Sequence, residues 1–421
     1  MIRSWFEIDL WKRILLAMVV GIVVGVLWGE GVSNIRWMGD LFLRLIRMVV
    51  VPLVFVTLVS GMVSMGDPSR LGSLGVKTLA VYMLTTLFAI TIGLFLAAVM
   101  QPGVGIDLSG AASQTLQEAI PLSQRLLNIV PNNPFAALAE GDFLATIFFA
   151  IVTGVSILVV GDKAKPLADI MDAGTEVMLK ITHWVMEVAP FGAMALIATI
   201  TGSQGVTALF DVVTLAMAVI LGCVAHVLLV HGSLLKFVLK LNPIAFFRGA
   251  RSAMLLAFST SSSSATLPVS MTVAEEKLGI KPVVASTVLP LGATINMDGT
   301  ALYVGVGSVF GAQAFGVDLA LVDYLLIAGA TTLVSVGTAG VPGASLFLMS
   351  AVMDTIGMTP AQIGVVIGFI LPFDRPLDML RTSVNVTGDL AVATAVANWE
   401  GEFDKEIFDR PDYPPEAVQH T

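Results

Sequence analysis

The segment Leu371–Leu390 constrains this chain most, because ionisable residues lie there inside an otherwise apolar stretch. They are Asp374, Arg375, Asp378, Arg381 and Asp389. At 100° per residue, one arc about 100° wide and about 22 Å long holds four of them with Thr382 and Asn385, and Arg375 lies just beyond its edge. A charge facing lipid at mid-bilayer costs about 2.5–3.5 kcal/mol, so the arc must face protein, water or a ligand. We favour a path for substrate and ions; an internal stripe of salt bridges is the alternative.

Composition places this segment in a membrane. Of the 421 residues, 56% are hydrophobic and only 13% charged, against about 25% charged in a soluble globular protein. The sequence therefore predicts an all-α polytopic membrane protein in contact with lipid, with room for about eight spans. No basic footprint for nucleic acid is present. The single cysteine, Cys223, excludes an intrachain disulfide.

The histidines are few and scattered through the sequence. They are His183, His226, His231 and His420. None has the spacing of a metal-binding motif, so we expect packing or interfacial roles and no metal site of the Cys/His type. We also expect no organic cofactor.

Hydropathy and loop charge predict the topology. Seven spans precede the charged helix, at Ile14–Trp28, Met38–Val63, Thr78–Met100, Phe143–Val160, Ile181–Ile200, Val206–Val230 and Val283–Phe310. Residues 101–142 are predicted as an external loop. Lys and Arg occur in alternate loops, which predicts cytoplasmic N- and C-termini, and no cleavable signal peptide is evident. The polar tail from Glu400 is predicted to be flexible.

Three segments break the pattern of simple spans. Ala253–Val273 has two half-length apolar arms around a serine-rich centre, which predicts a re-entrant hairpin that enters from the cytoplasmic side. The seventh span is interrupted at Asn296–Thr300. Leu321–Met353 is interrupted by three glycines and a proline, which predicts a second hairpin of opposite topology. Two such units indicate an inverted-repeat secondary transporter with a site near the membrane midplane.

Four blocks resemble the glutamate transporter homologues, the dicarboxylate/amino acid:cation symporters. The blocks are Ser261–Val269, Asn296–Tyr303, Gly337–Ala344 and Asp378–Asp389. The resemblance implies eight transmembrane helices, two re-entrant helical hairpins, a homotrimer and an elevator mechanism. It divides the chain into a scaffold (1–76 and 102–204), a transport domain (77–101 and 205–399) and a cytoplasmic tail (400–421).

The resemblance also implies the residues that bind an acidic amino acid. Arg381 would bind the side-chain carboxylate, and its planar fork suits that contact. Asp378 would bind the α-ammonium group. The remaining substrate residues would be Thr382, Asn385, Ser262, Ser263 and Thr300, with Val341 and Gly343 in the second tip acting as a gate.

Three sodium sites follow from the same resemblance, with sodium as the co-transported ion. The first would use Asp389 with backbone carbonyls near Gly292, Asn296 and Asn385. The second would use Ser335, Val336 and Thr338 with Thr294. The third would use Tyr82, Thr85, Thr86, Asn296 and Asp298. Met297, between the sites, would couple ions to substrate.

The charges of the site indicate the substrate. Asp378 and Arg381 together require one molecule with a cation and an extra anion, which describes L-aspartate or L-glutamate. A neutral amino acid would leave Arg381 unpaired, and a C4-dicarboxylate would leave Asp378 unpaired. An unpaired buried charge costs about 3–5 kcal/mol, enough to discriminate against both. The family resemblance implies sodium as the driving ion, because proton-coupled branches tend to lack the carboxylate of Asp389. Val304 stands where members linked to proton movement carry a glutamate.

Alternatives remain open beside this prediction. One is a proton-coupled or C4-dicarboxylate symporter of the same family, and another is an ion channel. An intramembrane enzyme is disfavoured, since no His or Lys is evidently placed to activate Ser263. One departure concerns a second arginine that relatives keep near the site: this chain has Ser261 and Met379 at those positions, and Arg375 is the nearest candidate. We expect a bacterial inner-membrane location.

Overall fold

A computed structural model describes residues 8, 10–64, 68–106, 127, 130–140, 143–205, 208–335 and 344–409. Within these ranges the ordered segments are helices, and the only bridge between extended residues joins Ile280 to Phe403. The N-terminal helices are α2 (Leu10–Trp28), η1 (Gly29–Asn34), α3 (Arg36–Ser64), α4 (Pro68–Met100), α6 (Pro134–Glu140), α7 (Phe143–Val160), η3 (Gly161–Ala164) and α8 (Lys165–Gln204). The C-terminal helices are α9 (Ala208–Ala225), η4 (His226–His231), η5 (Leu234–Val238), α10 (Pro243–Thr260), α11 (Ser263–Glu276), α12 (Pro282–Ile295), α13 (Asp298–Ala314), α14 (Leu321–Ser335), α15 (Ala344–Thr355), α16 (Pro360–Glu400) and α17 (Lys405–Asp409).

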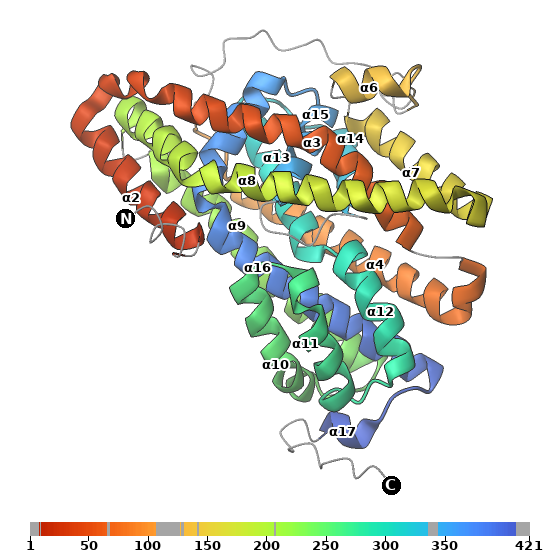
Figure 1. Ribbon diagram of the computed structural model, residues 1–421. Coiled ribbons are helices and arrows are strands. Elements are labelled where there is room, and N and C mark those ends of the chain that lie inside the picture. Colours follow the sequence, from red (N-terminus) through yellow and green to blue (C-terminus); the bar gives the residue numbers. More distant parts are fainter. Residues whose placement is uncertain are drawn as a thin grey trace.

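The helices form two packed groups around α16. On one side α8 packs along α2 and α3, and α7 packs against α3 (Figure 1). On the other side α10, α11 and α12 gather around the C-terminal half of α16, with α17 beyond them. Helices α4, α9 and α13 pack against α16 between these groups. Buried apolar residues form one core under each group, so the charged helix lies where they meet.

Helix α8 is longer than the span predicted at Ile181–Ile200. It begins at Lys165, because residues 165–180 form a helix although several charged residues interrupt their apolar pattern. The chain bends by 44° between Val185 and Glu187. Pro190 accounts for this bend, since a proline ring clashes with the carbonyl four residues earlier.

Helices α10 and α11 are the arms of the predicted first hairpin. Asn242 caps α10 by accepting a hydrogen bond from the Ile244 amide, so this arm begins ten residues before Ala253 in the sequence. Ser261 reverses the chain with a left-handed φ of 51°. Ser262 then caps α11 by accepting from the Ala265 amide. The serines therefore make the turn, as expected from their tendency to bond to nearby backbone.

The predicted break in the seventh span is confirmed and is shorter than expected. Only Asn296 (φ −91°, ψ 80°) and Met297 (φ −107°, ψ 50°) leave the helical conformation between α12 and α13. Asp298 and Thr300 belong to the first turn of α13, where the positive end of the helix dipole favours a carboxylate. Helices α14 and α15 match the arms of the second hairpin, and its tip (336–343) lies outside the described residues.

Helix α16 confirms that the charged segment is one continuous helix. It runs for 41 residues from a capping box, in which Thr359 and Gln362 bond to each other's backbone, to Gly401 in the left-handed conformation. All the arc residues named from sequence are buried, at 6% exposure or less, while the Arg375 side chain is 13% exposed.

The prediction of a flexible tail is wrong for residues 401–409. Phe408 is fully buried, and its ring lies 5.4 Å from that of Phe403. The Asp404 amide donates to the Gly279 carbonyl at 2.7 Å, and Lys281 pairs with Glu402 at 2.8 Å. The reason is that apolar residues among the tail charges supply surface that packs against the link from α11 to α12.

Three described stretches are long and apolar enough to cross a membrane. They are Lys12–Asn34, Leu74–Met100 and Val212–Val238, and the bent pair Phe148–Val185 and Glu187–Gly202 adds a fourth if it forms one span. Shorter apolar helices accompany them. The count of eight spans stays a prediction.

Candidate substrate and cation site

Arg381 forms the centre of a buried polar cluster on α16. Its Nη1 and Nη2 both donate to Asp374 Oδ1 at 3.0 Å, and Nη2 also donates to Asp378 Oδ1 at 2.9 Å and to Ser345 Oγ at 2.7 Å. The guanidinium carbon lies 3.7 Å from the ring centroid of Tyr303. This fully buried cation is thus held by two carboxylates and an aromatic face, as burial of a charge requires.

Asp378 lies between two arginines. Its Oδ1 accepts from Arg381, and its Oδ2 accepts from Arg375 Nη1 at 3.4 Å. Arg375 is less buried than Arg381 and makes a longer contact. Asp378 is the residue predicted to bind the ammonium group of the substrate. Both of its carboxylate oxygens therefore already have an arginine as neighbour.

Asn385, two turns beyond Asp378 on α16, binds the start of α13. Asn385 Oδ1 accepts from the Gly299 amide at 2.8 Å, and its Nδ2 donates to Thr300 Oγ1 at 3.3 Å. The same nitrogen lies 3.2 Å from the sulfur of Met297. Thr382 donates to its own helix, at the Asp378 carbonyl. The structure thus brings Asn385, Thr300 and Met297 together as predicted.

The serine-rich turn holds hydroxyls without partners. Ser261 Oγ and Ser263 Oγ are buried and have no hydrogen-bond partner within the described structure. Ser262 uses its hydroxyl to cap α11. Helix α10 packs along α16, and Ser383 of α16 donates to the Met254 carbonyl of α10 at 3.1 Å. The turn therefore offers donors next to the charged helix.

The predicted cation ligands converge from three helices and the break after α12. Asn296 Nδ2 donates to Asp389 Oδ1 at 3.0 Å, and Asn296 Oδ1 accepts from Thr85 at 3.3 Å. Thr86 donates to Asp298 Oδ1 at 2.8 Å. These five side chains are buried, so their oxygens form a compact set inside α4, α13 and α16 and at the break after α12.

Gly292 allows the backbone of α12 to lie close to the side chains of Asp389 and Tyr82. A Cβ atom there would lie 2.5 Å from Asp389 Oδ1 and would also meet the Tyr82 hydroxyl, which donates to the Val288 carbonyl at 3.0 Å. The glycine backbone can therefore approach the carboxylate closely. Two carboxylates, several hydroxyls and freed carbonyls suit a hard cation.

The structure does not show the predicted second sodium site as an assembled set of ligands. Thr294 donates to the Leu291 carbonyl and Ser335 donates to the Thr332 carbonyl, each within its own helix. Val336, Thr338, Val341 and Gly343 lie outside the described residues.

Comparison with known proteins fixes the family. The family model described as "Sodium:dicarboxylate symporter family" matches residues 10–399. The chain belongs to this family. Membership, together with the apolar helices, makes it an integral membrane protein of a transporter family.

Several characterised members of this family are similar over nearly their whole length. The chain is 33% identical over 412 residues to the proton/sodium-glutamate symport protein of Geobacillus stearothermophilus, covering 95% of this chain and 96% of the relative. It is 35% identical over 398 residues to the proton/glutamate-aspartate symporter of Bacillus subtilis, with 93% and 95% covered. It is 31% identical over 407 residues to a C4-dicarboxylate transport protein of Bacillus subtilis, with 94% and 95% covered.

Several residues of the candidate site are not evident from the sequence. The sequence assigns no role to Asp374, although its position on the arc of Arg381 is a usable signal. Tyr303 and Ser345 come from α13 and α15, and only tertiary packing brings them to Arg381.

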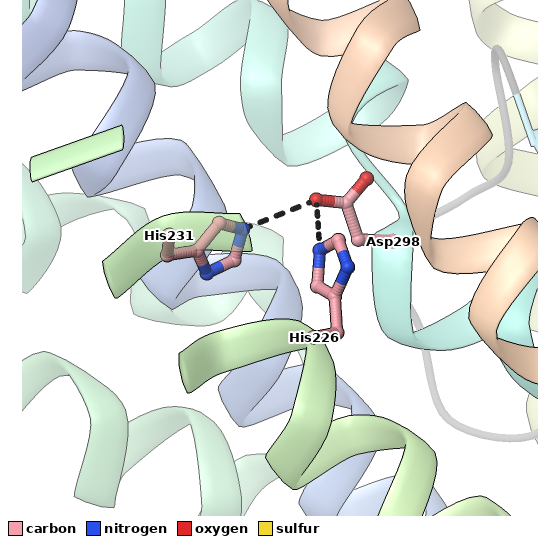
Figure 2. Close-up of side chains that lie close together, drawn as sticks. All are labelled: His226, His231 and Asp298. Carbon is pink, nitrogen blue, oxygen red and sulfur yellow. Dashed lines mark hydrogen bonds and ion pairs between the residues drawn. The ribbon is translucent and has the colours of Figure 1, made fainter. Parts of the chain in front are cut away.

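The structure gives two of the histidines a specific buried partner. His226 and His231, predicted to have packing or interfacial roles, both direct Nε2 at Oδ2 of Asp298, at 3.0 and 3.4 Å (Figure 2). The reason is a π-helical turn, in which the Gly232 amide donates to the carbonyl of Val227, five residues back. In an α-helix the two side chains would lie about 140° apart.

Proposed function

We propose that the chain is a sodium-coupled symporter of acidic amino acids, L-aspartate or L-glutamate. The proposal rests on one observation: Arg381 and Asp378, which carry opposite charges, are both buried on one face of α16. A substrate carboxylate would take the guanidinium donors now shared with Asp374, and its ammonium group would bind Asp378. Transport, rather than catalysis, is the activity that agrees with the family.

The proposed binding site of the coupling ion is a second polar cluster, which contains Asp389 of α16. Asp389 and Asp298 are buried carboxylates surrounded by hydroxyl and amide oxygens, which is the ligand set of a sodium ion. Asn385 and Met297 connect this cluster to the substrate region, because Asn385 contacts both Met297 and Thr300. Sodium binding would thereby favour the arrangement that receives the substrate.

The larger mechanism follows the family's pattern. We propose eight membrane spans, two re-entrant hairpins and a homotrimer in a bacterial inner membrane, with both termini cytoplasmic. The transport domain (77–101 and 205–399) would move as an elevator against the scaffold (1–76 and 102–204). The division between the α2–α3–α7–α8 group and the group around α16 supports this proposal.

A C4-dicarboxylate is a second candidate substrate, favoured by one contact. Arg375 lies 3.4 Å from Asp378, so it can supply the positive charge that an ammonium group would otherwise bring. A relative described as a C4-dicarboxylate transport protein is 31% identical.

A competition assay distinguishes these substrates. Radiolabelled aspartate uptake into proteoliposomes under an inward sodium gradient is measured with excess unlabelled aspartate, glutamate, succinate or serine. Inhibition by glutamate but not by succinate or serine is the expected result. Inhibition by succinate as strong as that by aspartate would favour a C4-dicarboxylate as the substrate. Absence of aspartate uptake would reject the amino acid symporter.

A further inference from the structure

His226 and His231, which have no role in the proposed transport, form a buried cluster with Asp298. Their three nearest ligand atoms lie within 4.8 Å of one another, and all three side chains are fully buried (Figure 2). The rings meet edge to face, with centroids 4.6 Å apart. A π-helical turn aligns the two histidines. Such turns are rare in proteins, and those that occur are often found at functional sites.

The Asp298 carboxylate presents two chemically different faces. Oδ1 lies against the hydroxyls of Thr86 and Thr85, at 2.8 and 3.5 Å. Oδ2 lies against two imidazole nitrogens. Hydroxyl and carboxylate oxygens suit a hard ion such as sodium, whereas imidazoles suit zinc, copper, iron or nickel. The ligand chemistry on the Oδ2 face is therefore that of a transition-metal ion.

Two of the three distances between the ligand atoms agree with this chemistry, and the two Nε2 atoms lie within 4.8 Å of each other. A zinc ion lies about 2.0–2.1 Å from each nitrogen or oxygen ligand, so two ligands at a tetrahedral angle are about 3.3 Å apart. The two Nε2–Oδ2 distances are 3.0 and 3.4 Å. Three protein ligands would leave a fourth position for water, as in many zinc sites.

We propose that His226 Nε2, His231 Nε2 and Asp298 Oδ2 bind a divalent transition-metal ion of the zinc class. Without the metal, each neutral ring can donate its Nε2 proton to the shared oxygen. On binding, each proton moves to Nδ1, and both Nδ1 atoms are buried without a partner in the described structure. Because outer-shell partners strengthen metal binding about 10–100-fold, their absence predicts an affinity lower by about that factor than that of a site with such partners.

Gly388 has no side chain, which allows the cluster of His226, His231 and Asp298 to lie close to the backbone of α16. A Cβ atom there would lie 3.2 Å from both Asp298 Oδ2 and His231 Nε2 and 2.7 Å from Asn296 Nδ2. A metal on Oδ2 and a sodium ion near Oδ1 would share one carboxylate, so each is expected to weaken binding of the other. This last step rests on the proposed sodium coupling, and the metal site itself does not.

Cobalt titration of the full-length chain tests the proposal. The protein is purified without a histidine tag, reconstituted in nanodiscs in sodium-free buffer and titrated with Co²⁺. The expected result is one Co²⁺ per chain with a visible d–d band that Zn²⁺ removes. His226→Gln and His231→Gln are expected to weaken binding at least about 100-fold, since loss of an outer-shell group alone costs about 10–100-fold. His183→Gln, which changes an exposed histidine on α8, serves as the matched control and should titrate like the wild type.

Ligand exchange separates metal binding from misfolding. His231→Cys keeps a ligand at this position, so it should retain Co²⁺ and add a sulfur-to-cobalt charge-transfer band. A wild-type chain without a band, or a band that the His226→Gln and His231→Gln variants share, would overturn the metal site. Titrations repeated in NaCl and KCl test the shared carboxylate: weaker Co²⁺ binding in NaCl supports sharing, and equal binding overturns that step alone.

Discussion

Replacement of Arg381 by alanine is the sharpest perturbation of the substrate site. The substitution removes donors to three side chains and leaves Asp374 and Asp378 buried without their main partner. A bound aspartate would then bury its side-chain carboxylate without the guanidinium, and breaking such a buried pair costs about 3–5 kcal/mol. At about 1.4 kcal/mol per tenfold, binding of aspartate should weaken by roughly 150- to 4,000-fold.

Arg375→Ala is the matched control for this prediction. Arg375 is also an arginine near Asp378, but it is partly exposed and makes a single contact at 3.4 Å. Its removal should weaken aspartate binding by about tenfold or less, in line with about 0.5–1.5 kcal/mol for one hydrogen bond. Binding is measured by calorimetry with aspartate in saturating sodium, after size-exclusion chromatography has verified folding. A folded Arg381→Ala variant that binds aspartate like the wild type would refute the reasoning, and so would an equal loss in both variants.

Three further predictions concern the cation cluster and the packing around it. Asp389→Asn removes a buried carboxylate, so the sodium concentration for half-maximal aspartate binding should rise at least about tenfold; an unchanged value would remove Asp389 from the sodium site. Gly388→Ala overpacks the cluster and should destabilise the protein by about 1–3 kcal/mol, seen as a lower Tm, whereas Gly329→Ala, where a Cβ meets no atom within 4 Å, should not. Phe408→Ala should lower stability by about 3–5 kcal/mol because this ring is fully buried; an unchanged Tm would contradict the docked tail.

Much of the site could be predicted from sequence because it depends on periodicity within one helix. The arc of Asp378, Arg381, Asn385 and Asp389 follows from 100° per residue, and the structure places all four in one buried stripe of α16. The break at Asn296 was also predictable, because Asn and Gly are poor residues in a helix interior.

What escaped prediction depends on packing or on irregular backbone. The contact of Arg381 with Tyr303 joins two helices, and no local pattern encodes it. His226 and His231 share a face only because the backbone is π-helical between them. The first half of α8 was missed for a different reason: its charged residues break the apolar run by which hydropathy recognises a span.

Ion dependence of uptake is the most direct test of the central proposal. Proteoliposomes that contain the purified chain are given an inward sodium gradient, an inward proton gradient or a potassium-only control, and accumulation of labelled aspartate is followed over time. Concentrative uptake is expected with the sodium gradient and not with the proton gradient alone. Uptake driven by protons to the same level in the absence of sodium would contradict sodium coupling through Asp389 and Asp298.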